Sequence, residues 1–137
     1  LRTSWVYSEF GKNFVKTMLS LFATKEELNV VADQYGQPTN ATDLAEAILT
    51  IVKTEKKTPG IFNFSNEGKI SWHDFAQKIA ELSVSKIKIN PIVTSQYPTP
   101  AKRPQNSTLD LDKIKSTYQI NIKPWEESLV KTIQILK

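Results

Sequence analysis

Segments with the spacing of a helix alternate with segments typical of strands along most of this 137-residue chain. Apolar residues recur three and four positions apart from Phe14 to Phe22, and the β-branched run LNVVAD follows at 28–33. Helical spacing then returns from Leu44 to Val52. Strands separated by helices predict an α/β fold, with a few mixed strands and at least some parallel pairing.

The remaining elements follow from the same patterns and from proline and glycine positions. Strands are expected at 1–7, 28–33, 61–66 and 86–95, the last interrupted at Pro91. Helices are expected at 13–23, 44–52, 72–82, 111–117 and after Pro124. The stretches QYGQPTN (34–40) and QYPTPAKRPQNS (96–107) are expected to be loops, because glycine and proline punctuate them.

Polar residues at the expected helix starts support these boundaries. Ser71 precedes one helix and Asp74 follows three residues later, the spacing of an N-cap residue and its partner. Asn13 is expected to cap the first helix, and the stretch 39–43 offers cap candidates with an acid in the first turn.

Composition excludes several classes of protein. The chain has no cysteine, which excludes a disulfide scaffold, a thiolate metal site and a cysteine nucleophile within it. No apolar run approaches the roughly 20 residues that span a bilayer, and no charged-then-apolar leader is visible. We therefore expect a cytoplasmic protein that does not bind membranes.

The charge of the chain points to small anions more than to nucleic acid. The net charge is +4 and the pI about 9.2, but the lysines are scattered, as at 53–57, 86–88 and 113–115. A single-strand binder would carry a basic stripe with aromatic residues between the charges. We expect no nucleic-acid partner, whereas a mildly basic surface suits an anionic small molecule such as a diphosphate.

Complete catalytic motifs are missing from these residues. The four glycines are isolated, so neither the G-x-G-x-x-G fingerprint nor a P-loop is present. No tyrosine is followed four positions later by a lysine, and the single His73 lacks the partners of a metal site or a triad. We expect no catalytic residue and no metal ligand in this chain.

Three places remain as candidates for binding. Trp5 ends the first expected strand, where ligands of open α/β sheets gather, although a core tryptophan fits equally well. The stretch 33–40 precedes a helix N-terminus, so it is either a segment that binds an anion or another ligand, or a structural turn that ends in a helix cap. The loop 99–107 carries Arg103 between prolines, followed by Asn106, and suits either phosphate recognition or plain solvation.

Four segments in order carry a resemblance to a known family. They are RTSWVYSEFGKNFVKTML, VVADQYGQPTNATDLAEAI, GIFNFSNEGKISWHDFA and YPTPAKRPQNSTLD. Together they resemble the dTDP-4-dehydrorhamnose reductases, which are extended short-chain dehydrogenases/reductases. With the abrupt start at Leu1, the resemblance implies a C-terminal, substrate-binding portion whose N-terminal Rossmann half is absent. Residues 1–137 would then be one domain, with 1–8 a late Rossmann strand of the parent protein.

The resemblance also implies a reaction and a set of binding residues. The parent enzyme would use NADPH or NADH to reduce dTDP-4-dehydro-6-deoxy-L-mannose to dTDP-L-rhamnose, with its catalytic tyrosine and lysine upstream. Trp5 would line the sugar pocket, and Arg103 and Asn106 would lie on the nucleotide-diphosphate side. Gln34 and Thr39 would shape the same cleft. By itself this portion would bind no cofactor and turn over no substrate, and a homodimer is expected.

Two alternatives stay open from the sequence. One is a non-catalytic regulatory or nucleotide-sugar-binding protein on the same scaffold, since fold alone does not decide function. The other is a free-standing small binding domain. The metal that some relatives hold through acidic residues has no matching acidic pair in this chain.

Overall fold

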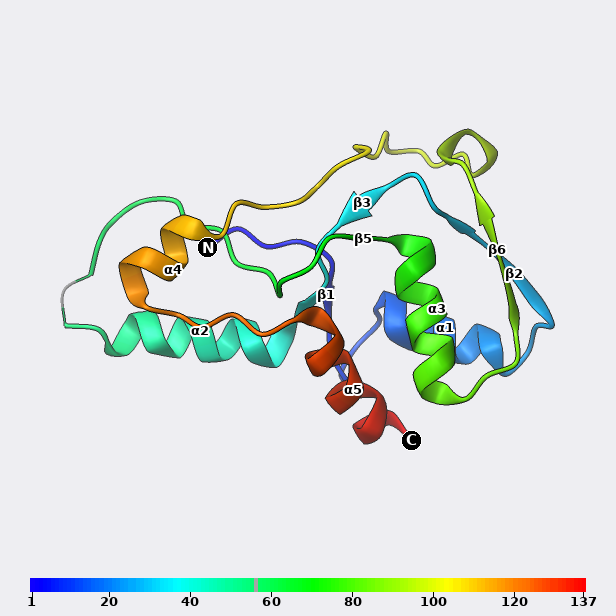
Figure 1. The fold of residues 1–137 in the computed structure, drawn as a ribbon, viewed down its shortest axis with the longest axis horizontal. Helices are drawn as coiled ribbons and strands as arrows, with labels where there is room; N and C mark the ends of the chain where they lie inside the picture. The colour runs from blue at the N-terminus through cyan, green and yellow to red at the C-terminus, as the bar shows by residue number, and fades with distance from the viewer. Residues whose placement is uncertain (56) are drawn as a thin grey trace.

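Short strands and five helices make up the computed structural model, which describes residues 1–55 and 57–137 (Figure 1). The strands are β1 (Val6–Tyr7), β2 (Glu27–Val31), β3 (Tyr35–Gly36), β4 (Thr39–Asn40), β5 (Ile70–Ser71) and β6 (Lys88–Ile92). The helices are α1 (Phe14–Phe22), α2 (Ala41–Lys53), α3 (Trp72–Ser83), α4 (Asp112–Tyr118) and α5 (Trp125–Leu136), with a 3-10 turn, η1, at Thr94–Gln96. Lys56, within the lysine-rich segment after α2, lies outside the described residues.

The strands pair in three two-stranded sheets. β1 lies parallel to β4, with Val6 opposite Thr39, and β2 lies parallel to β6 over five residue pairs. β3 and β5 are antiparallel. The predicted α/β class with mixed and partly parallel pairing is therefore confirmed.

The helix boundaries follow the predicted caps. Asn13 accepts a hydrogen bond from the Lys16 amide and starts α1. Ser71 and Asp74 form the reciprocal capping box that their spacing predicts. In the stretch 39–43 the cap of α2 is Asn40, whose side chain accepts from the amides of Thr42 and Asp43.

The apolar side chains gather in two clusters. Figure 1 shows α2 and α4 at one end of the molecule, and α1, α3 and β2 at the other. The first cluster packs α1, α3, α5 and β2 around Phe75 and Leu129, which are fully buried. The second packs α2 against α4 around Phe64 and Ile114. The periodic apolar positions of α1, α3 and α5 thus meet in one core cluster.

Two predicted strands are wrong in extent. The segment 1–7 contains only the two-residue β1, because Trp5 adopts a left-handed backbone with φ of 47° and breaks the extended run. The segment 61–66 forms no strand, and its Asn63 makes only an isolated bridge to Arg2. The two segments meet at this one bridge, and too few of their residues pair in register to make a ladder.

Two further expectations also need correction. Pro91 does not interrupt β6, in which it pairs opposite Val30. The sheet has only two strands, so a residue of β6 whose nitrogen faces the open edge needs no N–H donor, and proline is tolerated there. The predicted loop 34–40 contains β3 and β4, each of which finds its partner in a distant segment. None of the helices in the described residues is both long and apolar enough to cross a bilayer.

Candidate binding site

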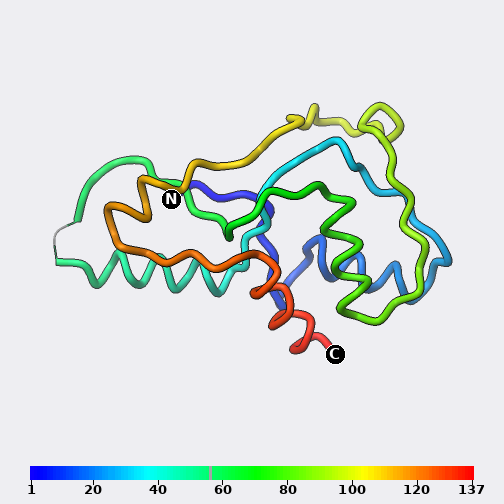
Figure 2. The backbone as a smooth tube through the Cα atoms, viewed as in Figure 1, coloured from blue at the N-terminus to red at the C-terminus, as the bar shows by residue number. Residues whose placement is uncertain are grey.

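A hollow of about 950 Å³ opens beside α1, β2 and the start of α3. Its floor is apolar and comes from the first core cluster, including Phe14, Met18 and Val30. The segment after β6 runs past β3 toward α4 (Figure 2), and its residues Tyr97, Thr99 and Arg103 line the other side. An apolar hollow with a few polar groups is the usual form of a small-molecule site.

Trp5 lies in the wall of this hollow. Its left-handed backbone is a conformation that costs a non-glycine residue about 1–2 kcal/mol. The Thr39 amide donates to the Trp5 carbonyl at 3.1 Å and holds the turn in place. The indole therefore enters the hollow from a strand whose course is bent at this residue.

Arg103 is the one charged residue among those described that line the hollow. Its guanidinium makes no ion pair with any carboxylate of residues 1–55 or 57–137. A guanidinium without a protein partner beside an apolar hollow can receive two oxygens of an anion. The arrangement thus combines an aromatic wall with a single cation.

The segment 33–37 fixes both ends of the loop that carries Arg103. At one end the Asp33 carboxylate accepts from the Thr94 amide at 2.9 Å and from its hydroxyl at 2.7 Å. These Thr94 hydrogen bonds hold the pKa of Asp33 below its ordinary value. At the other end the Gln37 side chain accepts from the Leu109 amide at 2.6 Å.

Main-chain bonds complete this attachment. The Tyr35 amide donates to the Gln105 carbonyl, and the Ser107 amide donates to the Tyr35 carbonyl, both at 2.8 Å. A proline-rich loop without regular structure is therefore tied down on both sides of Arg103.

The structure brings together three of the five residues predicted to bind substrate. Trp5, Gln34 and Arg103 line the same hollow, whereas Thr39 and Asn106 do not. The Gln34 amide donates to the Thr94 hydroxyl at 3.1 Å, so it also supports the loop.

The other two predicted residues lie outside the hollow, each close in the structure or the sequence to a residue that lines it. Thr39 is fully buried, and its hydroxyl donates to the Ser4 carbonyl at 2.6 Å, next to the bend at Trp5. Asn106 is exposed, and its side chain accepts from the amide and the hydroxyl of Thr108 at 3.3 and 3.0 Å.

Sequence reasoning missed several residues of the hollow. Trp72 is the first residue of the helix expected at 72–82, and its helical spacing does not mark it as a binding residue, yet it lines the hollow and stacks on Trp5. Tyr97 and Ser107 also line the hollow, and both belong to the predicted loop 96–107. The proximity of prolines to Tyr97 was the one local signal, since a stiffened loop can present an aromatic ring.

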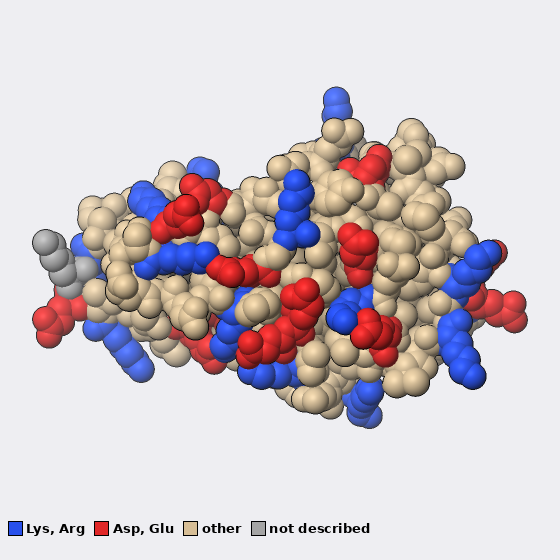
Figure 3. Space-filling model, in the orientation of Figure 1, with Lys and Arg blue, Asp and Glu red and all other residues tan. Residues whose placement is uncertain are grey.

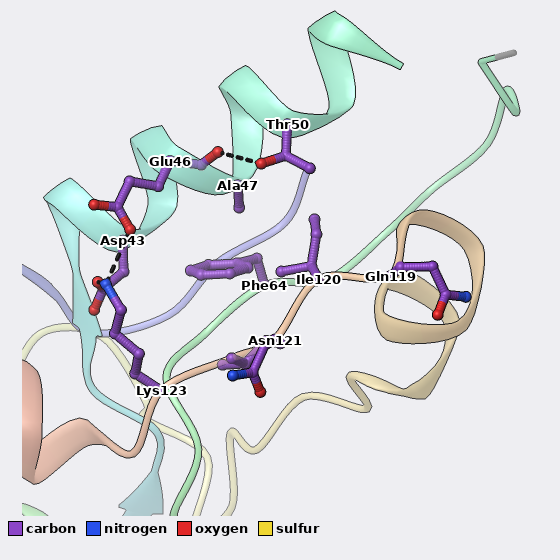
Figure 4. Close-up of a pocket in the computed structure, with 10 residues that line it drawn as sticks. Asp43, Glu46, Ala47, Thr50, Phe64, Gln119, Ile120, Asn121 and Lys123 are labelled. Atoms are coloured by element: carbon purple, nitrogen blue, oxygen red, sulfur yellow. Dashed lines mark hydrogen bonds and ion pairs between the residues drawn. The ribbon is translucent and has the colours of Figure 1, made fainter. Parts of the chain in front are cut away.

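A second, smaller hollow of about 170 Å³ lies between α2 and the segment 119–123. Figure 4 shows Lys123 reaching from that segment to Asp43 on α2. The Lys123 ammonium lies 2.9 Å from both Asp43 and Glu46, and the Asp43 carboxylate also accepts from Ser128 and Asn66. Because these polar groups satisfy one another, we interpret this hollow as structural.

The pKa values of Asp43 and Lys123 in this network shift in opposite directions. Burial raises the pKa of Asp43, but hydrogen bonds from Ser128, Asn66 and Lys123 outweigh burial and leave it below its ordinary value. Hydrogen bonds to Asp43 and Glu46 raise the pKa of Lys123. Both shifts favour the charged pair.

The surface charge shows no single-sign stripe on the face that Figure 3 presents, where acidic and basic side chains are interspersed. Among the described residues no group of three or more histidine and carboxylate side chains is placed to hold a metal ion. The hollow beside Trp5 therefore stands as the main candidate for ligand binding.

Comparison with known proteins gives one consistent family. The family profile described as the RmlD substrate binding domain matches residues 1–137. A dTDP-4-dehydrorhamnose reductase of Sinorhizobium fredii is 45% identical over 145 residues, covering 99% of this chain and 49% of that protein. A second dTDP-4-dehydrorhamnose reductase, from Aggregatibacter actinomycetemcomitans, is 42% identical over 139 residues, which cover 94% of this chain and 47% of that protein.

A solved structure agrees with these sequences. The dTDP-4-dehydrorhamnose reductase of Bacillus anthracis, crystallised in complex with NADP, superposes with a TM-score of 0.91 at 36% identity. The match covers 99% of this chain and 47% of that chain. The chain thus spans about half the length of the relatives it matches.

Proposed function

Because this chain belongs to the RmlD substrate binding domain family, we propose that it is the substrate-binding part of a dTDP-4-dehydrorhamnose reductase. The whole enzyme transfers a hydride from NADPH or NADH to the C4 ketone of dTDP-4-dehydro-6-deoxy-L-mannose and forms dTDP-L-rhamnose. This chain holds and orients the nucleotide sugar. Its location in the cytoplasm and its assembly as a homodimer stay predictions.

The pairing of Trp5 and Arg103 in one hollow carries this proposal. A dTDP-sugar has a doubly charged diphosphate beside a largely apolar deoxysugar. The guanidinium of Arg103 is suited to two diphosphate oxygens, because its donors match that geometry. The indole of Trp5 is suited to the deoxysugar, which offers C–H groups to an aromatic ring.

The other predicted residues support these two contacts. Thr39 holds the bend that presents Trp5, through its amide and its hydroxyl. Gln34 and Asp33 hold the start of the loop that presents Arg103. We propose that Asn106 shapes the far end of that loop on the diphosphate side, through its turn with Thr108.

The residues of this chain do not fit a nicotinamide dinucleotide on their own. Dinucleotide sites need glycines that let the backbone approach the pyrophosphate. The four glycines of this chain are far apart in sequence and form no G-x-G-x-x-G turn. At Gly36 and Gly68 the rings of Trp5 and Trp125 also fill the space beside the backbone. The chemistry of the cofactor therefore belongs to the rest of the enzyme, and the share of this chain is binding and orientation.

Turnover in the natural polypeptide that contains these 137 residues tests the function. Loss of NADPH absorbance is followed with dTDP-4-dehydro-6-deoxy-L-mannose as substrate. We expect Arg103→Ala to lower kcat/KM about 10- to 100-fold, because hydrogen bonds to charged groups contribute about 1.5–3 kcal/mol. Trp5→Ala is expected to lower kcat/KM by a similar factor.

Matched variants separate the site from the surface. Lys102→Ala removes a neighbouring exposed charge and should leave kcat/KM within about twofold, as for an ordinary surface substitution. The 137-residue chain alone should show no turnover. Cofactor binding without turnover in the natural polypeptide would contradict the enzyme and favour a non-catalytic nucleotide-sugar-binding protein.

A further inference from the structure

The indole of Trp5 is stacked on a second indole, that of Trp72. The rings of Trp5 and Trp72 lie with centroids 3.5 Å apart and planes 11° apart. Both side chains line the hollow and both are partly exposed. Trp72 therefore covers one face of the residue to which we assign the sugar contact.

Trp72 is itself fixed by its surroundings. It is the first residue of α3, directly after the Ser71–Asp74 capping box, so its backbone is set by the helix start. The Phe14 ring packs on it at 4.7 Å, and Phe14 in turn stacks on the buried Phe75 at 5.5 Å. A chain of aromatic contacts thus connects Trp5 to the first core cluster.

Gly36 supports the indole at another contact. A Cβ atom at this position would lie 2.4 Å from Cε2 and 2.6 Å from Cζ2 of Trp5. Such distances mean that the backbone of β3 already touches the ring. The indole is thus held by a partner ring and by main chain, on a backbone that is strained at Trp5 itself.

From this arrangement we infer that Trp72 is a positioning residue, which holds the Trp5 indole in the orientation that receives the sugar of a nucleotide sugar. The inference rests on the proposed function. An indole that is already immobilised loses less conformational entropy when a ligand binds, so the stack increases affinity for the sugar. Trp72 acts through Trp5 and contributes nothing to the nucleotide.

Two ligands test this assignment, one that carries the sugar and one that ends at the diphosphate. Affinities for dTDP-L-rhamnose and for dTDP are measured by calorimetry on the natural polypeptide that contains this chain. In Trp72→Leu the advantage of dTDP-L-rhamnose over dTDP should fall about tenfold, the upper value for one aromatic pair. The affinity for dTDP alone should change less than about twofold, because we assign Trp72 no contact with the nucleotide or with Arg103.

Further variants separate positioning from folding. Trp72→Phe keeps an aromatic ring on Trp5 and should restore part of the sugar advantage. Ile79→Val removes packing from the buried face of the same helix, where Ile79 is fully buried, and should lower the melting temperature with the sugar advantage intact. The signature of coupled indoles in circular dichroism should disappear in Trp72→Leu and in Trp5→Leu, and persist in Ile79→Val.

A double variant completes the design. If Trp72 acts through Trp5, then Trp72→Leu should have no further effect on the sugar advantage once Trp5→Leu is present. An unchanged sugar advantage in Trp72→Leu, with the indole signature lost, would overturn the positioning role and leave the proposed function standing. Wild-type protein that keeps the signature but binds neither ligand would overturn the proposed function, and the inference with it.

Discussion

Single residues at the hollow are constrained by contact, and Gly36 is the sharpest case. Its backbone touches the benzo ring of Trp5, and the space that a side chain would need also lies 2.7 Å from the Ser107 hydroxyl. Gly11 differs, since it has a left-handed φ of 62° but nothing within 4 Å of a Cβ. Steric contact therefore restricts the residue at position 36, whereas the left-handed backbone restricts the residue at position 11.

We expect Gly36→Ala to displace the Trp5 indole, because the added methyl overlaps the ring. The free energy of unfolding should fall by about 1–3 kcal/mol, the cost of overpacking, and affinity for dTDP-L-rhamnose should fall with it. Gly11→Ala should cost about 1 kcal/mol through the backbone alone and leave affinity unchanged. Chemical denaturation and calorimetry measure both effects, and equal affinities in the two variants would contradict the contact.

At the scale of elements, the C-terminal cap of α3 is held in a strained backbone conformation. The C-cap residue of α3, directly after Ser83, is Val84, a β-branched residue with φ of 59° that is 79% exposed. Its amide donates to the Glu81 carbonyl at 3.1 Å, and the Ser85 amide donates to the Ala80 carbonyl at 2.9 Å. This left-handed position closes the helix well but suits glycine far better than valine.

Val84→Gly should therefore stabilise the protein. A side chain in the left-handed conformation costs about 1–2 kcal/mol, which glycine avoids. Glycine also gives the unfolded chain more conformational freedom, which offsets part of this gain in stability. We expect a gain of about 0.5–1 kcal/mol in thermal or urea unfolding. Gln77→Gly, at an exposed position inside the same helix, should lose about 1 kcal/mol. A loss in both variants would show that Val84 makes contacts that outweigh its strain.

At the scale of the whole molecule, α5 joins the two core clusters. Its Leu129 and Ile133 pack into the first cluster, while Ser128 and Thr132 hydrogen bond to Asp43 and Asn40 at the start of α2. Asn66 adds bonds to both Asp43 and the Asn40 amide. A buried polar network thus connects the end that carries α2 and α4 with the end that carries the hollow.

The network makes stability depend on pH at the acid end. The pKa of Asp43 is lowered in the folded state, so its stabilisation is complete above the unfolded pKa of about 4 and is lost as pH falls through the lower folded pKa. Asp43→Asn should cost about 1–3 kcal/mol at neutral pH, because it removes the charged acceptor of Ser128, Asn66 and Lys123 and leaves Lys123 with Glu46 alone. The substitution should also flatten the acid loss. Glu46→Gln, on the exposed partner of the same lysine, should cost less than about 1 kcal/mol.

Unfolding curves at a series of pH values measure this dependence. An acid loss of equal size in wild type and Asp43→Asn would assign it to other carboxylates, of which Asp33 is the first to test, because its pKa is also lowered.

Local sequence determined the helices of this protein and their starts. Ser71 with Asp74, and Asn13 before Phe14, act within one helical turn, so their effect can be read from neighbouring residues. The same holds for the apolar spacing that buries Phe75 and Leu129. The family resemblance further marked Trp5 and Arg103, but it gave no contact between either residue and the rest of the chain.

Only the tertiary structure decided the two-residue strands and the site. Two-residue strands and the bridge at Asn63 exist through hydrogen bonds to distant segments, so a strand-like pattern could not say whether 61–66 would find a partner. The stack of Trp72 on Trp5 and the attachment of the Arg103 loop to segment 33–37 likewise join residues far apart in sequence. Local spacing carries no information on such pairs, because the packing of distant segments against one another selects them.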